Sequence, residues 1–351
     1  MPNAKKLPSG NWRCVIDVGK TPDGKRRRKS FTATTKKEAE YIAMQYAIEY
    51  KDSINDCTVG TAIDNYIKSK DGVLSPTTIQ GYQKIRKNNI RGLMDIKVST
   101  LTTQTIQAFI NEESKAISPR TGKPLSPKTI RNIHGLITSA LKFHDPRLTF
   151  NVTLPQNKVD YIELPSARDV FRAVKGSSVE LPCMLALWLG LSLSEIRGIK
   201  YSSIINNTLI INRARVDVYN KPYDKMTPKT DARNRFYTLH EYLLDLLKKT
   251  PEYKESALTG HDLNLIPQTH SQISYGLKKA LATYNLPVIS FHKLRHLNAS
   301  VMLMLNIPDK YAMERGGWAT NHTMKHIYQH TFSEERKNID EIMDSFFDDM
   351  L

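Results

Sequence analysis

His292 and Arg295 lie three positions apart, and their types and spacing suit chemistry on a phosphate group. They begin a segment in which Leu297 and Val301 recur at helical spacing, so a helix would place both polar side chains on one face. Ser290 is the expected N-cap of this helix. The free N–H groups at a helix start favour a bound phosphate, so the pair could hold one there.

His296 offers an alternative, because it follows His292 by four positions and two such histidines can share a zinc ion. The zinc-protease motif also needs glutamate directly after the first histidine, and this chain has no glutamate there. We therefore predict no metal at this site and no cofactor elsewhere. A lone His-x-x-Arg is most often an ordinary surface pair, so a function must rest on further residues.

Breaking and rejoining a DNA strand without an external energy source requires three kinds of group. A side-chain nucleophile must keep the phosphodiester energy in a covalent intermediate. Fixed cationic donors must meet the negative charge that gathers on the phosphate oxygens in the transition state. An acid must protonate the departing 5′-oxygen. Tyrosine suits the first role, because a 5′-hydroxyl can attack its phosphate ester and reseal the strand.

Three further residues fit these roles. Trp318 and Tyr328 follow the His-x-x-Arg pair, and Lys229 precedes Arg233 and Arg235. Taken singly, each has an ordinary explanation: a lone tryptophan is usually a core residue, one of 16 tyrosines is usually a packing residue, and one lysine among many is unremarkable. Their joint order and spacing favour the chemistry.

Together these residues resemble the active site of the tyrosine recombinases, the phage integrase family. The resemblance implies that Tyr328 is the nucleophile, which forms a 3′-phosphotyrosine, and that Arg295 binds the scissile phosphate. It implies that His292 accepts or stabilises the tyrosine proton. It also implies that Trp318 donates a hydrogen bond to the scissile phosphate and that Lys229 is the general acid on a mobile hairpin.

The first arginine of the family's active site is missing from this chain. That arginine lies in a Gly-Leu-Arg-x-Ser-Glu box, and residues 190–195 have Gly-Leu-Ser-Leu-Ser-Glu, with Ser192 at its position. Serine offers one neutral hydroxyl in place of a fixed charge with a fork of donors. Losing one transition-state donor costs about 10²–10³ in rate, and an arginine in phosphoryl transfer is worth about 10³–10⁵. We therefore predict DNA binding with strongly impaired cleavage.

Arg197 is close to Ser192 in sequence, but it lies five positions on. On a helix this spacing turns the side chain about 140° away, so we do not expect Arg197 to replace the missing arginine. Serine at position 192 is either an introduced inactivating substitution or a feature of a natural accessory protein, and the sequence leaves both open.

An excess of basic residues favours a polyanionic partner. The 351 residues include 51 Lys+Arg and 35 Asp+Glu, which gives a formal charge of +16. Membranes are anionic too, but the longest apolar stretch, 181–193, has 13 residues against the roughly 20 that cross a bilayer. Three cysteines are too few for a disulfide framework, and the amino terminus lacks a signal peptide's apolar core. We expect a cytoplasmic protein of a bacterial host cell, without a membrane partner.

Residues 1–56 are expected to form a small basic module. The pattern predicts strands on both sides of a Thr-Pro-Asp-Gly turn at 21–24, then a helix that Thr35 begins. The apolar residues of this helix are Ile42, Tyr46 and Ile48. The basic run includes Arg26, Arg27 and Arg28. Such a run can be a solvated face or a localisation tract, but the module resembles the arm-site-binding domain of many integrases, which favours DNA.

Residues 57–150 have a helical pattern. Ser75-Pro76 and Ser126-Pro127 each place an N-cap serine and a first-turn proline before an amphipathic run. Both helices are basic and almost without acid. A charged helix is usually a solvated face, but this shared polarity favours DNA, and the segment resembles the family's SAM-like core-binding domain. The residues that we expect to contact DNA here are Lys84, Lys87, Lys128 and Arg131.

Residues 151–165 contain two prolines and little periodicity, which predicts a linker. Residues 166–351 would form the catalytic domain, with strands at 208–218 and 235–239. In its last segment, 333–351, apolar residues recur at helical spacing. This tail helix either packs on its own core or docks on a neighbouring protomer in a synaptic tetramer, as the family's terminal segments often do. We favour docking on the neighbour.

The expected fold is multidomain and mainly α-helical with small β-sheets. It comprises an N-terminal three-stranded sheet with a helix, a helical core-binding domain and a mixed α+β catalytic domain. The resemblance implies core and arm DNA sites as partners, together with a directionality factor. Two other functions stay open: a non-catalytic DNA-binding or architectural protein, and a type IB topoisomerase, against which the basic front module and the short chain argue.

Overall fold

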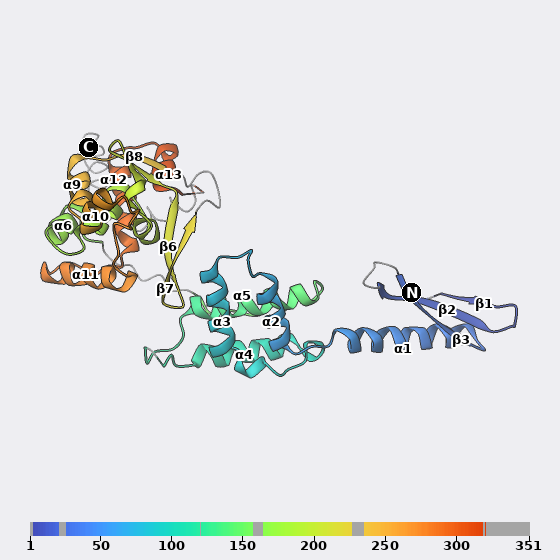
Figure 1. Cartoon of the computed structure of the whole chain (residues 1–351). Coiled ribbons are helices and arrows are strands. Elements are labelled where there is room, and N and C mark those ends of the chain that lie inside the picture. The colour runs from blue at the N-terminus through green and yellow to red at the C-terminus, as the bar shows by residue number, and fades with distance from the viewer. Residues whose placement is uncertain are drawn as a thin grey trace, which may run out of the picture. The chain divides into compact units, whose positions relative to one another are not determined.

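The structure is a computed structural model of the chain. It describes residues 3–20, 26–119, 121–156, 164–226, 235–318 and 320. Two compact units, Met1–Lys158 and Val159–Leu351, make up the chain (Figure 1). The described elements are mostly helices with small antiparallel sheets, which confirms the predicted fold class. Among the described residues, no helix is both long enough and apolar enough to span a bilayer.

A three-stranded antiparallel sheet opens the first unit. Its strands are β1 (Ala4–Lys6), β2 (Trp12–Lys20) and β3 (Arg26–Ala33), in that order across the sheet. Helix α1 (Lys36–Asn55) packs on β2 and β3, and Thr35 caps it by accepting a hydrogen bond from the backbone N–H of Glu38 at 3.3 Å.

Alanines form the sheet-facing side of α1. Ala39 and Ala43 are fully buried against Cys14 of β2. Of the apolar residues that the sequence offered for this helix, Ile42 and Ile48 are 37% and 54% exposed, whereas Tyr46 packs against the buried cluster. The small alanine side chains allow the helix backbone to lie close to the sheet, which the bulk of isoleucine would prevent.

A separate helical body follows in the same unit. Its helices are α2 (Val59–Ser69), α3 (Pro76–Asn88), α4 (Thr103–Lys115) and α5 (Pro127–His144). Short 3₁₀ turns, Arg91–Leu93 and Val98–Thr100, lie between α3 and α4. Ser75 and Ser126 cap α3 and α5 as predicted, by accepting hydrogen bonds from the N–H groups of Thr78 and Thr129. The core is aliphatic, with Ile63, Ile130, Ile133, Leu136 and Ile137 almost fully buried.

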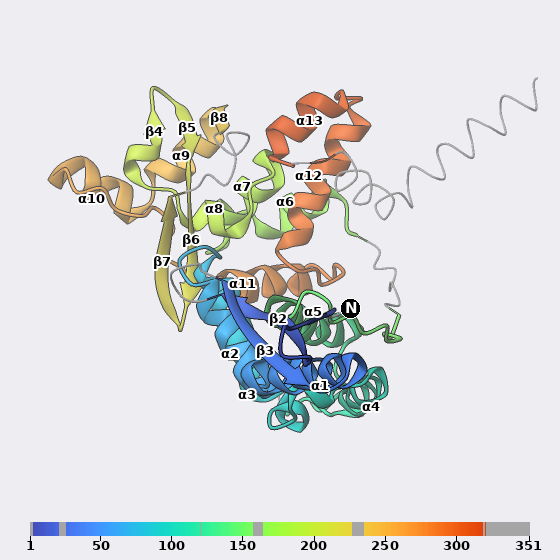
Figure 2. The same ribbon diagram turned by 90° about the vertical axis from the view of Figure 1, so that its right-hand side faces the viewer.

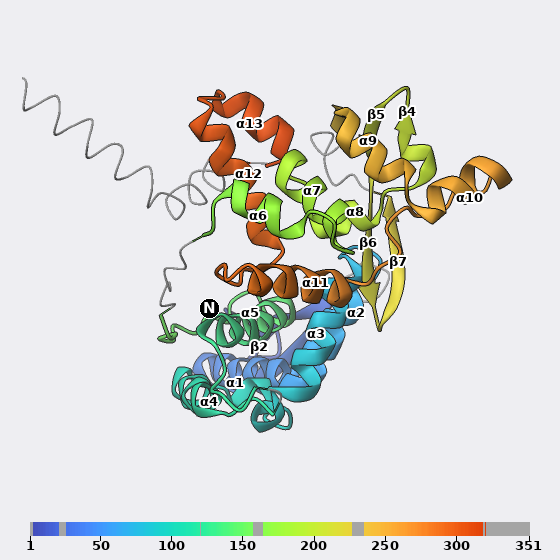
Figure 3. The same ribbon diagram turned by 90° about the vertical axis from the view of Figure 1, so that its left-hand side faces the viewer.

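The second unit is built around one large apolar core. Its helices are α6 (Ala167–Val174), α7 (Glu180–Leu189), α8 (Leu193–Arg197), α9 (Glu241–Lys248), α10 (Pro251–Thr259), α11 (His270–Thr283), α12 (His292–Met304) and α13 (Asp309–Gly316). A 3₁₀ turn, Tyr201–Ser203, follows α8. Helix α12 lies beside α7, which joins segments more than 100 residues apart in sequence (Figure 2, Figure 3).

The strands of the second unit form two sheets. One sheet has the order β4 (Ile204–Ile205), β5 (Thr208–Ile211) and β8 (Arg235–Thr238), and the other pairs β6 (Arg213–Val218) with β7 (Lys221–Met226). The predicted strand region 208–218 is divided into β5 and β6 at Asn212, where the chain changes strand partner. Tyr219 and Asn220 turn the β6–β7 ribbon with φ of 50° and 63°, the left-handed pair of a tight hairpin.

The alanine face of α1 generates a stability prediction. Replacing Ala43 with leucine should overpack the contact between α1 and the sheet and cost about 1–3 kcal/mol of local stability. Amide hydrogen exchange along α1 and β2 measures this loss. The matched control is Met44→Leu, one position on at a side chain that is 51% exposed. Equal exchange rates in the two variants would show that α1 does not pack on the sheet through its alanines.

Candidate active site

Ser192 lies at the sharp turn between α7 and α8. Gly190 ends α7 in the left-handed conformation, with φ of 68°, and Ser192 is the N-cap of α8. Its hydroxyl donates to Oε2 of Glu195 at 2.7 Å and accepts from the Glu195 N–H at 3.4 Å, while its own N–H donates to Oε2 at 2.8 Å. Serine at this position therefore caps a helix in a reciprocal capping box.

The Glu195 carboxylate contacts Ser192 and two arginines. Its Oε1 accepts a hydrogen bond from Nη2 of Arg235 at 2.5 Å, and its Oε2 lies 3.8 Å from Nη1 of Arg295. Burial raises the pKa of Glu195, but the Arg235 charge, the hydrogen bonds from Ser192 and the Arg295 charge together bring it below its ordinary value of 4.5. The carboxylate is therefore ionised at neutral pH.

Arg295 is held from several sides. It lies in the first turn of α12, is 8% exposed, and donates from Nη1 to the backbone oxygen of Gly190 at 2.8 Å. Its guanidinium carbon lies 5.0 Å from the ring centroid of Trp318. The predicted N-cap, Ser290, was wrong: α12 begins at His292 with Phe291 at the N-cap position, and Ser290 contributes its carbonyl oxygen to the N–H of Lys293.

Trp318 reaches the site through a glycine turn. Gly317 ends α13 with φ of 64°, and a Cβ on Gly316 would come within 2.4 Å of the indole ring. The ring is 8% exposed and packs in a small apolar cluster with Met302 and Ala312. Packing and the contact with Arg295 together fix the orientation of the indole.

His292 begins α12 and is exposed at the surface. The pKa of His292 is lowered from its ordinary value of 6.5. The largest cause is that neighbouring protein atoms remove part of its hydration, and the positive charges of Arg295 and Lys293 lower the pKa further. The ring of His296 lies edge-on to it, with 5.0 Å between centroids. His292 is therefore mostly neutral at pH 7 and can accept a proton.

Ser192, Arg295 and Trp318, three of the predicted catalytic residues, meet at this site, and His292 lies on the same helix as Arg295. Lys229 and Tyr328 fall outside the described residues. Sequence reasoning gave no role to Glu195 or Arg235, although the Ser-x-x-Glu spacing of a capping box was visible. Among the described residues, no cluster of His, Cys, Asp and Glu could hold a metal ion.

Arg197 is bound elsewhere. Its Nη1 and Nη2 each donate to the carboxylate of Asp217 at 2.8 Å, and its Nε donates to the backbone oxygen of Gln268 at 3.1 Å. The Arg197 side chain is 5% exposed and that of Asp217 is 33% exposed, so the two form a partly buried ion pair apart from Glu195.

The side chains predicted to contact DNA are accessible where the structure describes them. The exposed ones are Arg28, Lys84, Lys87, Lys128 and Arg131. The side chains of Arg26 and Arg27 lie outside the described part. Arg131 donates from Nη2 to the backbone oxygen of Pro155 at 3.2 Å, so it also ties α5 to the segment after it.

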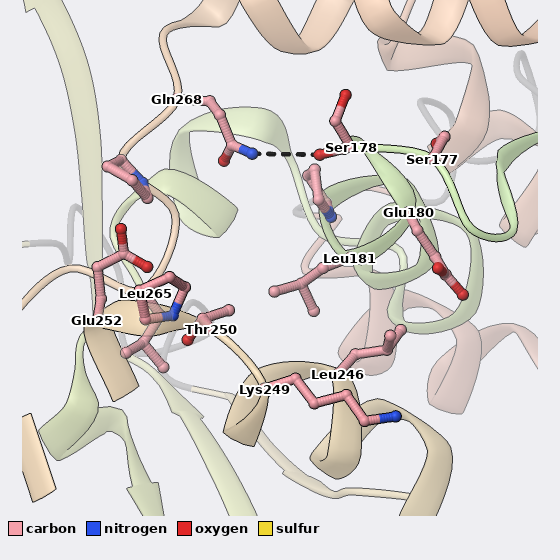
Figure 4. Close-up of a pocket in the computed structure, with 13 residues that line it drawn as sticks. Ser177, Ser178, Glu180, Leu181, Leu246, Lys249, Thr250, Glu252, Leu265 and Gln268 are labelled. Carbon is pink, nitrogen blue, oxygen red and sulfur yellow. Dashed lines mark hydrogen bonds between the residues drawn. The ribbon is translucent and has the colours of Figure 1, made fainter. Parts of the chain in front are cut away.

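A pocket of about 350 Å³ lies elsewhere in the second unit (Figure 4). The starts of α7 and α10, the end of α9 and the segment before α11 line it, and Gln268 donates to the backbone oxygen of Ser178 across it at 3.2 Å. None of the predicted site residues lines this pocket, so it is separate from the cluster around Glu195.

Two segments of the chain match known families. Residues 172–335 match the phage integrase family, and residues 58–114 match the phage integrase N-terminal SAM-like domain. The chain belongs to the phage integrase family of tyrosine recombinases. The catalytic match includes all six positions that the sequence analysis assigned to catalysis.

Relatives of this integrase-family chain are similar along most of its length. A tyrosine recombinase XerC-like protein of Caldanaerobacter subterraneus subsp. tengcongensis is 22% identical over 96% of both chains. An integrase of Staphylococcus phage L54a is 22% identical over 74% of this chain and 83% of the relative.

Two solved integrases share the fold. The Tn1549 transposon integrase bound to transposon right end DNA has a TM-score of 0.64 at 16% identity, covering 82% of this chain and all of that one. A lambda integrase tetramer bound to a Holliday junction has a TM-score of 0.54 at 19% identity, covering 93% and 94%.

The cluster around Glu195 generates a stability prediction. Glu195→Gln keeps the shape of the side chain but removes the negative charge that Arg235 and Arg295 both face, which should cost about 3–5 kcal/mol at pH 7. Because the folded-state pKa of Glu195 is lowered, its stabilisation is present above 4.5 and is lost as the pH falls through the folded-state value. Chemical unfolding across this pH range measures the difference, which should shrink at low pH. The exposed Glu255→Gln is the control, and equal stabilities of the two variants at pH 7 would contradict the prediction.

Proposed function

We propose that this chain is a site-specific DNA recombinase that integrates or excises a mobile element through a 3′-phosphotyrosine intermediate. The convergence of Arg295 and the turn at Ser192 on one buried carboxylate, with Trp318 against the Arg295 guanidinium, supports this most strongly. In such a cluster, a fixed cation and a fixed indole lie next to each other, as charge stabilisation at a phosphate requires.

In the proposed mechanism, Tyr328 attacks the scissile phosphorus and the 5′-oxygen leaves. Arg295, held by Gly190 and Glu195, donates to the phosphate oxygens, and the Trp318 N–H adds a further donor. His292, neutral at pH 7, accepts the tyrosine proton, while Lys229 protonates the leaving oxygen. Resealing is the same reaction in reverse, with a 5′-hydroxyl as the nucleophile.

The chain is proposed to hold DNA with three of its parts. Residues 1–56 would bind arm sites, 57–150 would bind the core site, and 166–351 would cleave it, with 151–165 as the linker. Exposed cations on β3, α3 and α5 support the first two assignments. A tetramer on DNA, assembled through 333–351 and regulated by a directionality factor in the cytoplasm of a bacterial cell, completes the proposal.

Ser192 is the reason to propose that cleavage is impaired. Its hydroxyl is committed to Glu195, and a neutral capping group gives a phosphate no counter-charge. The same observation favours the second candidate function, a non-catalytic DNA-binding protein derived from a recombinase. The two functions differ in whether one substitution restores the chemistry.

Restoring the arginine tests the proposal. Ser192→Arg should raise the rate of covalent adduct formation at least about 10²-fold, because it adds a transition-state cation. The measurement is covalent capture on nicked suicide DNA, with a core duplex selected from a random library by its binding to this chain. Adding Tyr328→Phe to the restored protein should abolish the adduct. Tight binding without an adduct from any variant would favour the non-catalytic protein.

The lowered pKa of His292 generates a prediction for pH dependence. In the Ser192→Arg background, adduct formation should fall only when the pH drops below 6.5, because protonation of His292 then removes the base. His292→Gln should lower the rate by about 10²–10⁴ and remove this acid limb. The control is His270→Gln, which changes an exposed histidine at the start of α11. An unchanged acid limb in His292→Gln would assign the titration to another group.

A further inference from the structure

A second guanidinium lies in the cluster beside that of Arg295. Arg235 is the first residue of β8, its side chain is 4% exposed, and it faces Glu195 from the side of the sheet. The cluster therefore holds two buried guanidiniums around one carboxylate. Every donor of a buried arginine normally has a partner, so each donor of Arg235 has to be accounted for.

The hydrogen bonds of Arg235 leave part of its donor fork unused. Nη2 donates to Glu195, and Nη1 makes a long contact of 3.4 Å with the backbone oxygen of Arg315. Within the part of the chain that the structure describes, the buried Nε has no hydrogen-bond partner. Arg197, buried to the same extent, has Nε, Nη1 and Nη2 all bound. A buried, unpartnered N–H is costly unless a ligand supplies the acceptor.

Arg235 lies among the residues assigned to the scissile phosphate. It binds one oxygen of the Glu195 carboxylate, while Ser192 binds the other. On its far side, a Cβ on Gly317 would come within 2.7 Å of Nη1, and the next residue is Trp318. The Arg235 guanidinium therefore lies between two turns. One is the turn at Ser192, where the family has its first arginine, and the other is the turn at Gly317, which precedes Trp318.

We propose that Arg235 is a catalytic residue, which supplies to the scissile phosphate the second guanidinium that position 192 lacks. The inference rests on the proposed recombinase function and deepens it. Arg235 makes no covalent bond and moves no proton. Its Nε–H donates to a phosphate oxygen as negative charge develops there, while Nη2 stays on Glu195, which keeps the fork oriented. The remaining activity of a Ser192 chain would then depend on Arg235.

A double-mutant cycle between positions 192 and 235 tests this dependence. The four proteins are the chain itself, Arg235→Gln, Ser192→Arg and the double variant. A fifth variant, Arg235→Lys, keeps the positive charge but lacks the planar set of guanidinium N–H donors. The substrate is the selected suicide duplex with a sulfur replacing the scissile 5′-oxygen, because a thiolate leaves without an acid and makes slow cleavage measurable. Single-turnover adduct formation is compared with DNA affinity measured on the same duplex.

We expect Arg235→Gln to slow adduct formation about 10²–10³-fold in the Ser192 chain, but less than about 10-fold with arginine at 192. DNA affinity should change little, and Arg235→Lys should recover only part of the rate. Arg197→Gln is the matched control, since it removes a buried arginine from another ion pair and should lower stability without this dependence on position 192. Thermal unfolding of both variants separates a folding defect from a chemical one.

Two results would overturn the inference while leaving the recombinase function intact. Equal losses from Arg235→Gln in both backgrounds would show that Arg235 only supports Glu195 structurally. An adduct from Ser192→Arg but none from the Ser192 chain on the sulfur-containing duplex would show that Arg235 replaces nothing. If no protein of the cycle forms an adduct despite binding the duplex, the recombinase function itself fails, and the inference fails with it.

Discussion

The ionised carboxylate of Glu195 is the interaction on which the catalytic unit's arrangement depends. A buried carboxylate is tolerated only where charges and hydrogen-bond donors surround it, and here they come from three separate parts of the chain. Ser192 lies three residues before Glu195, Arg235 begins a strand 40 residues after it, and Arg295 lies in a helix 100 residues after it. Satisfying one carboxylate therefore fixes the α7–α8 turn, the edge of the β4–β5–β8 sheet and the start of α12 together.

This arrangement explains how serine can occupy position 192 without disturbing the fold. The N-cap needs a side-chain oxygen, which serine supplies, and the carboxylate needs cations, which Arg235 and Arg295 supply. The position is thus structurally complete even though it lacks a cation for phosphate. Assembly of the site and chemistry at the site have different requirements, so the fold can be kept even where, as proposed for this chain, cleavage is impaired. The basic helices α3 and α5 belong to the other unit, so the charges proposed to bind DNA are independent of position 192.

Short sequence patterns predicted the features of this structure that depend on residues close together in sequence. The N-caps at Ser75 and Ser126 follow from serine–proline starts, and α12 follows from apolar spacing after His292. Contacts between distant segments were not accessible in this way. The alanine face of α1 was missed because isoleucine is the more apolar residue, while the sheet contact requires the smaller one. Arg235 was visible only as one basic residue near Lys229, since its partner Glu195 lies 40 positions earlier.

Two glycines in the left-handed conformation, Gly190 and Gly317, help to position the two arginines that surround the Glu195 carboxylate. Gly190 turns the chain so that its own carbonyl oxygen meets Arg295, and a Cβ there would come within 2.5 Å of Oδ1 of Asn298. Asn298 in turn donates to the carbonyl oxygens of Leu187 and Trp188, which closes the end of α7 against α12. Gly317 leaves room for the Arg235 guanidinium in the same manner. Each arginine of the cluster is thus held by a carboxylate on one side and backed by a glycine turn on the other. Cations fixed in this way need little reorganisation when charge develops on a phosphate, which is the condition under which electrostatic stabilisation of a transition state is strongest.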